Sequence, residues 1–337
     1  MKTLKLILMA VLALSVPAVA QPLVKLGTLA PSGTIFHQEL LAMGQKWQAA
    51  PGGGVRLVVY PGGTLGGETE MVQRMRIGQL QAAMLTVTGL SRIDDSVAAI
   101  QNMPMMFRTV EELEYVRDQM KPMFEKKLRD AGFVVLFWGD AGWVRFFSTE
   151  PGLMPDDFKR LKLWSWGGSP DTTRIWRAAG FQPVEMEVTD ILLGLNTGRI
   201  QVVPTEPSYA VAGQFYTHTK YMLDMKWAPL VGATVISART FDAFKPETRT
   251  AILAAAQEAG KRITLESRKN SDDAIRILQE KHGLKVQEMT SEAEAAWLAA
   301  CEAAYPKIRG SIVPADTFDQ VVRHLEDYRK THPQAQK

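Results

Sequence analysis

The stretch FKRLKLWSWGGSPDTTRIWRAAGFQPVEMEVTDILLGLNTGRIQVVPTEP occupies residues 158–207 and predicts alternating strands and helices. A short strand is expected over residues 161–166, and a helix follows over residues 169–179. After a glycine turn, a second extended piece leads to a helix over residues 189–197 and a strand over residues 200–203. Proteins that repeat this unit bind small ligands at the ends of their strands. We therefore expect the stretch to form one wall of a ligand cleft.

Two tryptophans, Trp164 and Trp166, stand in the first strand of this stretch. Side chains two residues apart on a strand point to the same face, so the two rings should lie together. We expect them to shape what the cleft accepts. The alternative is that they belong to the hydrophobic core, which is the more common place for a tryptophan in a strand.

The first twenty residues, MKTLKLILMAVLALSVPAVA, have the composition of a Sec signal peptide. Lys2 and Lys5 precede an apolar run, and small residues precede the expected cleavage site after Ala20. A membrane anchor is the alternative, but the apolar run is shorter than the ~20 residues that a spanning helix needs. We therefore expect an exported, periplasmic protein that is soluble once the peptide is removed.

The charge of the mature chain is close to zero, which argues against nucleic-acid binding. The sequence has 39 basic and 36 acidic residues, and removing Lys2 and Lys5 with the signal peptide leaves 37 basic residues against 36 acidic ones. Such a balance provides no basic surface for nucleic acid.

Cys301 is the single cysteine, so an intramolecular disulfide is impossible. What remains of the 337 residues is more than one core usually serves, so we expect two domains.

Outside the opening stretch, strands and helices also alternate, which predicts an α/β fold. A very long helix is expected over residues 246–282, with Pro246 in its first turn and Gly283 at its C-cap. Unbroken, it would span about 55 Å, so we expect it to bridge the two domains. Further strands are expected over residues 23–28, 55–60, 80–86, 132–138 and 230–237, and further helices over residues 111–130, 209–217, 291–305 and 315–329.

Each expected domain is built from separate pieces of chain. The chain should cross between the domains at residues 139–142, GDAG, because two glycines can absorb a change in backbone direction there. The expected division is domain I over residues 21–141 and 230–269, domain II over residues 142–229 and 270–330, and a disordered tail over residues 331–337.

The glycine-rich segment YPGGTLGGE at residues 60–68 invites comparison with a phosphate-binding loop. Such a loop needs a lysine and a serine or threonine directly after its last glycine. Here Gly67 is followed by Glu68 and Thr69. An acid at this position would repel a phosphate, so we expect a turn that leads into a helix.

Several segments, taken in order, are more specific than a general α/β pattern: YPGGTLGGE, RIGQLQAAML, NMPMMF, DDFKRLKLW and GLNTGRIQVVPTEP. Together with the long helix they resemble the DctP-type solute receptors of tripartite ATP-independent periplasmic (TRAP) transporters. The resemblance runs from about Leu23 to Arg329. It implies a periplasmic binding protein clamshell, in which two α/β domains close over one small organic ligand. It also implies delivery to membrane subunits that use an ion gradient rather than ATP.

The sequence departs from this family where the family binds carboxylates. The strand position that usually carries an arginine for a substrate carboxylate is Trp164 here. A second arginine of the family falls on Val144, with Arg145 one residue further along. Because adjacent strand residues face opposite sides, Arg145 would reach the cleft only if the strand were bulged or shifted. Its two interpretations are a salt-bridged scaffold and a relocated carboxylate partner.

Four further departures follow the same trend. Thr205 stands where the family's DGQENP segment offers an asparagine, and Thr86 stands where the third strand usually ends in an acid or amide. Leu29 replaces a polar contact after the first strand, and Val188 replaces an aromatic residue of the wall. Each change removes charge or adds apolar surface.

These departures predict a ligand that is more apolar or neutral than the family's usual dicarboxylates. An indole has one N–H donor and cannot replace the two-pronged grip of a guanidinium on a carboxylate. We expect the ligand to be packed between Trp164, Trp166 and Val188, with contributions from Trp143 and Trp227. Glu68 lies in a contact region of the family, but an acid at a helix start is also explained by capping and the helix dipole.

Nothing in the sequence indicates catalysis, and we expect neither a cofactor nor a metal. The five histidines, His37, His218, His282, His324 and His332, are scattered, and no pair has zinc-ligand spacing. No nucleophile motif surrounds Cys301. The alternatives to a TRAP receptor are an ABC-type receptor and a sensor-coupled binding protein. An accessory periplasmic protein that delivers an apolar ligand is a further possible partner.

Overall fold

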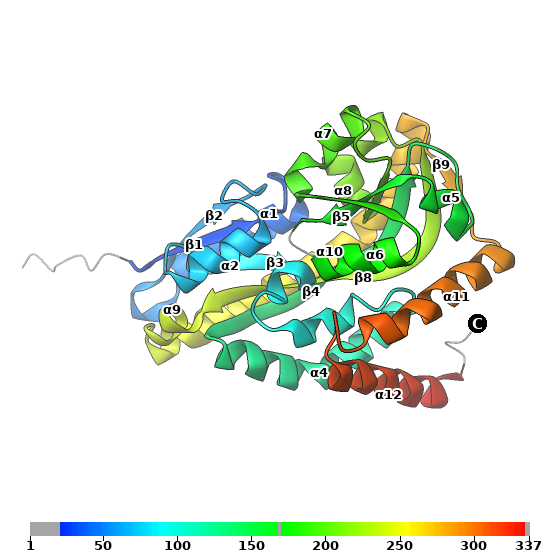
Figure 1. The fold of residues 1–337 in the computed structure, drawn as a ribbon. Coiled ribbons are helices and arrows are strands. Elements are labelled where there is room, and N and C mark those ends of the chain that lie inside the picture. Colours follow the sequence, from blue (N-terminus) through cyan, green and yellow to red (C-terminus); the bar gives the residue numbers. More distant parts are fainter. Residues whose placement is uncertain (1–20, 168–169, 334–337) are drawn as a thin grey trace, which may run out of the picture.

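The structure is a computed structural model that describes residues 21–167 and 170–333 (Figure 1). The expected signal peptide, its cleavage after Ala20 and the end of the expected tail lie outside the described residues. Within the described part, nine strands form one sheet in the order β2-β1-β3-β8-β4-β7-β5-β6, with β9 paired to β8. The strands are β1 (Leu23–Thr28), β2 (Arg56–Tyr60), β3 (Ala82–Thr86), β4 (Phe133–Ser148), β5 (Lys162–Trp166), β6 (Gln182–Met186), β7 (Val202–Thr205), β8 (Tyr221–Ser237) and β9 (Lys285–Gln287).

The sheet has two parallel parts that are joined by two long antiparallel strands. β1 pairs in parallel with β2 and β3, and β5 pairs in parallel with β6 and β7. β4 and β8 pair with each other, and they also pair with β7 and β3, respectively. Figure 1 shows both long strands running from one end of the molecule to the other. We call the part built on β1, β2 and β3 the first half, and the part built on β5, β6 and β7 the second half.

The structure corrects the expected limits of β4 and β8. The sequence predicted a strand that ends at residue 138 and another that begins at residue 230, whereas β4 continues to Ser148 and β8 begins at Tyr221. The glycines of GDAG do not end β4 because pairing resumes after one extra residue. Asp140 lies opposite Val231, and Trp143 lies opposite Pro229. This bulge coincides with the expected crossing between domains.

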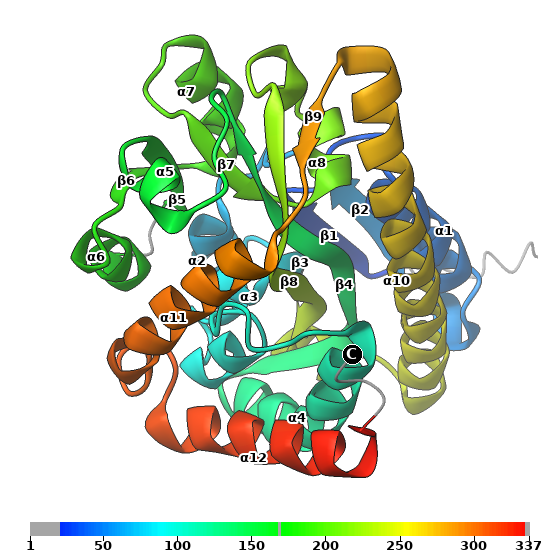
Figure 2. The same cartoon turned by 90° about the vertical axis from the view of Figure 1, so that its right-hand side faces the viewer.

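The longest helix is α10, Pro246–His282, and its predicted limits are confirmed. Gly283 follows it in the left-handed conformation that glycine favours at a helix end. Figure 2 shows α10 running beside both halves of the molecule. No helix in the described part of the chain is long and apolar enough to span a membrane. The other α-helices are α1 (Ile35–Gln48), α2 (Glu68–Arg76), α3 (Val87–Leu90), α4 (Val110–Asp130), α5 (Pro155–Lys159), α6 (Pro170–Ala178), α7 (Ile191–Asn196), α8 (Pro207–Ala212), α9 (Ala238–Asp242), α11 (Ser291–Ile308) and α12 (Ala315–Thr331).

The stretch over residues 158–207 has the predicted alternation, with differences in its second part. The predicted helix over residues 189–197 is a 3₁₀ turn, Val188–Asp190, followed by α7. The strand expected over residues 200–203 is β7, which begins and ends two residues later. The helix predicted over residues 209–217 is divided into α8 and a 3₁₀ turn, Phe215–Thr217.

In the part of the chain that the structure describes, four clusters of buried hydrophobic residues hold the sheet and helices together. Two lie in the first half, where one includes residues of α2, α4 and α12 and the other includes residues of α1 and α10. The other two pack around β5 and β7 in the second half. Helix α12, which we expected in domain II, packs against α4, with Phe318, Val321 and Leu325 in the same cluster as Leu113. The division into domains remains a prediction.

Candidate functional site

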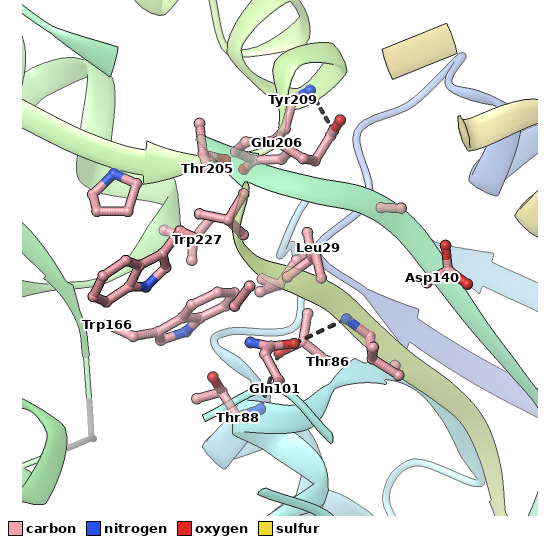
Figure 3. Close-up of a pocket in the computed structure, with 18 of the residues that line it drawn as sticks. Leu29, Thr86, Thr88, Gln101, Asp140, Trp166, Thr205, Glu206, Tyr209 and Trp227 are labelled. Atoms are coloured by element: carbon pink, nitrogen blue, oxygen red, sulfur yellow. Dashed lines mark hydrogen bonds between the residues drawn. The ribbon is translucent and has the colours of Figure 1, made fainter. Parts of the chain in front are cut away.

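A cavity of about 1020 Å³ is lined by residues of both halves (Figure 3). The first half contributes the ends of β1 and β3 and the start of α2, and the second half contributes β5, β7 and α8. The middle of β4 and β8 lies between these two sides. A cavity of this size is at the upper end of the range of ~300–1,000 Å³ that is typical of small-molecule sites.

The structure brings nine of the eleven predicted site residues to this cavity. They are Leu29, Glu68, Thr86, Val144, Trp164, Trp166, Val188, Thr205 and Trp227. Leu29 packs against hydrophobic clusters of both halves, which places it where the two sides meet. Trp143 and Arg145 are not among the described lining residues.

Trp164 combines both interpretations that the sequence left open. Its side chain lines the cavity, yet it is only 6% exposed and packs in a core cluster with Val188 and Met186. Its indole N–H donates to the backbone carbonyl of Met186 at 3.0 Å. The Trp166 ring lies beside it, with ring centroids 5.2 Å apart, and is more exposed. Since the one donor of Trp164 is occupied, the ring offers a ligand apolar surface only.

Of the two interpretations of Arg145, the structure agrees with the salt-bridged scaffold. Its side chain is 9% exposed and forms an ion pair with Asp224, and its Nη1 lies 3.5 Å from the carbonyl oxygen of Trp143. Val144, the preceding residue, lines the cavity. The bulge in β4 therefore does not bring Arg145 into the cavity, and the alternation of strand side chains holds at this point.

Trp143, which we expected to contribute to the cleft, packs elsewhere. It is 8% exposed and belongs to a core cluster of the first half, where the Nζ of Lys226 lies 5.7 Å from the centre of its ring. Trp143 and Val144 are neighbours on a strand and so face opposite sides. The expectation that both residues face the ligand was inconsistent with this alternation.

Glu68 is buried beneath the cavity wall and is held by the protein itself. Its carboxylate accepts hydrogen bonds from the backbone N–H of Thr86 and of Gly89 and from the Thr86 hydroxyl, each at 2.7 Å. Burial raises the pKa of Glu68 to about 7, and these three bonds oppose the rise. The helix-start interpretation of Glu68 is incomplete, because its carboxylate ties α2 to the start of α3. The Thr86 hydroxyl is also committed to this arrangement.

Glu206 is a cavity residue that the sequence interpretation missed. It is 2% exposed, and its carboxylate accepts from the backbone N–H groups of Ser208 and Tyr209 and from the Ser208 hydroxyl. Burial raises its pKa to about 7. Figure 3 shows Glu206 and Tyr209 together at the end of β7. The signal was present, because an acid before a proline and a serine is typical of a helix N-terminus.

The raised pKa of Glu206 predicts a pH dependence of stability. Because its pKa is 4.5 ordinarily and about 7 when folded, the native state holds more protons than the unfolded chain between these values. Its contribution to the free energy of unfolding is therefore complete below about pH 4.5 and is lost as the pH rises through about 7, by up to about 1.4 kcal/mol per pH unit. Denaturant unfolding of wild type and Glu206→Gln at pH 5, 6, 7 and 8 measures this. The wild type should lose stability relative to the variant along the series, and a constant difference would contradict the assignment.

The aromatic residues at the far side of the cavity were also missed. Trp176 on α6 stacks on Trp227, with ring centroids 5.1 Å apart and an interplanar angle of 22°. Phe181 and Trp297 complete this wall. The tryptophan of α6 lies within the quoted stretch, but its direction depends on how α6 packs against α11, which no local pattern indicates.

Acidic side chains outnumber basic ones along the cavity. Of the lining residues that the structure describes, Arg92 is the only lysine, arginine or histidine, whereas the acids are Glu68, Asp95, Asp140, Glu206 and Asp273. Asp140 is paired with Arg268 on α10, with distances of 2.7 and 2.8 Å. Within the described chain there is also no group of three or more metal-ligating side chains.

A cavity lined by both halves of an α/β sheet whose two parts are joined by long crossing strands is typical of periplasmic solute-binding proteins. The model of the family described as bacterial extracellular solute-binding protein, family 7 (DctP) matches residues 26–310. The chain belongs to this family, whose members bind solutes and are not enzymes.

Individual relatives agree with this assignment. The C4-dicarboxylate-binding periplasmic protein DctP of Rhodobacter capsulatus is 23% identical over 85% of this chain and 86% of its own length. The 2,3-diketo-L-gulonate-binding periplasmic protein YiaO of Escherichia coli is 26% identical over 62% of this chain and 63% of its own length.

Solved structures of TRAP periplasmic solute-binding proteins have the same fold. One from Shewanella oneidensis with bound succinate has a TM-score of 0.84 at 15% identity and covers 91% of this chain and 100% of its own. One from Xanthobacter autotrophicus with bound β-D-galacturonate has a TM-score of 0.82 at 18% identity and covers 90% of this chain and 99% of its own. These identities establish the fold of this chain and leave its ligand open.

Proposed function

We propose that this chain is a periplasmic receptor that captures a small organic ligand between its two halves and delivers it to the membrane subunits of a TRAP transporter. Membership of the family supports the receptor role, and the N-terminal sequence supports export with cleavage after Ala20. The cavity is lined by both halves, so domain closure would enclose a ligand. In this proposal, residues 21–141 and 230–269 move relative to residues 142–229 and 270–330, and the backbone bends at residues 139–142. Helix α12 is the exception within residues 270–330, because it packs against α4 and would move with residues 21–141.

We further propose that the ligand is more apolar or neutral than the dicarboxylates that this family usually binds. The observation that carries this is Trp164, whose only donor is bonded to Met186 and whose ring faces the cavity. Arg145, the alternative carboxylate partner that the sequence offered, is committed to Asp224, and Arg92 is the one basic residue among the described lining residues. The described lining also holds a single basic residue, which is too few to balance a ligand with two negative charges.

Identification of the bound ligand tests this proposal. The protein is purified from its own periplasm, and native mass spectrometry followed by extraction identifies the molecule that copurifies. We expect a neutral or predominantly apolar molecule, and in calorimetry on the unliganded protein we expect succinate and D-galacturonate to bind with a Kd above about 1 mM. Micromolar binding of a dicarboxylate would contradict the ligand proposal. Uptake by the reconstituted system that requires ATP instead of an ion gradient would contradict the TRAP assignment.

A further inference from the structure

The cavity extends beyond the space between the two halves into an apolar compartment between α6 and α11. Helix α6 contributes Thr172, Ile175 and Trp176 to the lining, and Ala179 follows directly after it. Helix α11 contributes Trp297, Ala300, Cys301, Ala304 and Ile308. Figures 1 and 2 show the two helices on the same side of the molecule, and they are in contact. Of the described lining residues, those from these two helices carry no charge.

The aromatic side of this compartment is rigid. Trp176 stacks on Trp227, and Trp227 meets Trp297 edge to face with ring centroids 5.9 Å apart. The indole N–H of Trp297 donates to the carbonyl oxygen of Leu153 at 2.9 Å, so this ring is held by a hydrogen bond as well as by packing. Aromatic rings that are held by packing against one another provide apolar contact surface with little loss of side-chain freedom.

Beyond Trp297, the same face of α11 carries small side chains. Ala300 and Ala304 line the cavity, and both are partly exposed within it. Ala299 and Ala303, one residue earlier in each case, lie on the solvent face of the same helix. The alanines that face the cavity leave space that a larger residue would fill, and the solvent-facing alanines provide matched controls.

Polar groups are concentrated at the other end of the cavity. Figure 3 shows Thr86, Thr88, Gln101 and Thr205 around the space between the halves. Gln101 accepts from the backbone N–H of Val231 at 2.9 Å, which directs its amide along the wall. The cavity therefore has a polar end between the halves and an apolar end between α6 and α11.

We propose that the compartment between α6 and α11 binds the hydrocarbon part of an elongated amphipathic ligand whose polar head lies near Thr88 and Thr205. This inference rests on the proposed receptor function and names the class of solute. The lining reaches residues of α6 and α11, none of which is charged among those described, so the cavity offers an elongated ligand an uncharged second region.

A chain-length series tests the compartment. Primary alcohols and the matching linear monocarboxylates from four to ten carbons are titrated into the unliganded full chain, with calorimetry and tryptophan fluorescence as readouts. Each methylene that enters the compartment should tighten binding roughly fourfold until the space is filled. In Ala304→Leu the added side chain occupies the space, so the longest probes should bind roughly tenfold or more weakly than to wild type, and the shortest should change little. Ala300→Leu is the second such variant.

Ala303→Leu and Ala299→Leu place the same side chain on the solvent face of α11. They should bind every probe of the series with the affinity of the wild type. The inference is overturned if wild-type affinity rises with chain length neither in the alcohol series nor in the monocarboxylate series. It is also overturned if Ala304→Leu and Ala300→Leu retain the wild-type dependence of affinity on chain length while thermal unfolding shows that both variants are folded. If the probes bind with an affinity that is independent of their chain length, only the compartment is overturned. If no probe binds and no solute copurifies with the protein, the proposed function is overturned as well.

Discussion

Replacing Trp164 with alanine is expected to lower the free energy of unfolding by about 3–5 kcal/mol, as for other buried tryptophans, and to abolish ligand binding at the concentrations that saturate the wild type. The side chain is 6% exposed, and the change removes its contacts with the cluster around Met186 and Val188. It also leaves the Met186 carbonyl without its indole partner. Denaturant unfolding measures the first effect, and calorimetry with the copurified ligand measures the second.

Trp166→Ala is the matched comparison for this experiment. Trp166 lies on the same strand and the same face, lines the same cavity and is more exposed than Trp164. Its replacement should weaken binding with a smaller loss of stability, because less buried surface is removed. If Trp164→Ala proves less destabilising than Trp166→Ala, the core role of Trp164 is wrong. If Trp164→Ala binds the ligand as the wild type does, the ring does not contribute to the site.

Much of the fold could be predicted because its signals are local. Pro246 and Gly283 mark the ends of α10, and both limits agree with the structure. β1 also has its predicted limits, since an apolar run that ends at a turn requires no distant information. The limits of β4 and β8 could not be predicted, because β4 continues through Gly139 and Gly142, and β8 through Pro229, by pairing with each other over a long separation in the sequence.

The distinction between local signals and contacts distant in the sequence also explains which residues of the candidate site could be predicted. The place of Trp164 at the cavity was predicted by comparing the pattern LKLWSW with the family pattern. The role of Arg145 stayed open because its partner, Asp224, is 79 residues away and belongs to β8. Glu206 had a local helix-start signal that was overlooked. The compartment between α6 and α11 is formed by the packing of two helices more than a hundred residues apart, so only the structure shows it.

The second large effect is expected at Arg268, which fastens the middle of α10 to β4. The Asp140 side chain is 2% exposed, and Arg268 binds both of its oxygens, through Nε at 2.8 Å and Nη2 at 2.7 Å. The Ser267 hydroxyl also donates to the Asp140 carbonyl at 2.8 Å. These contacts lie at the bulge of residues 139–142, so they hold α10 at the point where the chain crosses between the halves.

Arg268→Met keeps most of the aliphatic stem and removes the charge. We expect a loss of about 3 kcal/mol in the free energy of unfolding, because the buried carboxylate of Asp140 loses its main partner. Among the described ion pairs, its remaining charged partner is Arg117, whose Nη1 lies 3.5 Å away. Arg276→Met is the matched control on the same helix. Its side chain is 60% exposed and bound to Asp273, and its loss should cost about 1 kcal/mol or less.

A second substitution separates the buried charge from lost packing. Asp140→Asn in the Arg268→Met background removes the unpaired carboxylate, so the double variant should be more stable than Arg268→Met alone. The coupling energy from this cycle should exceed about 1 kcal/mol, since residues in direct contact are not additive. An additive cycle would show that the Arg268–Asp140 pair does not fasten α10 to β4. In that case the bend at residues 139–142 would be held by backbone pairing and by Ser267.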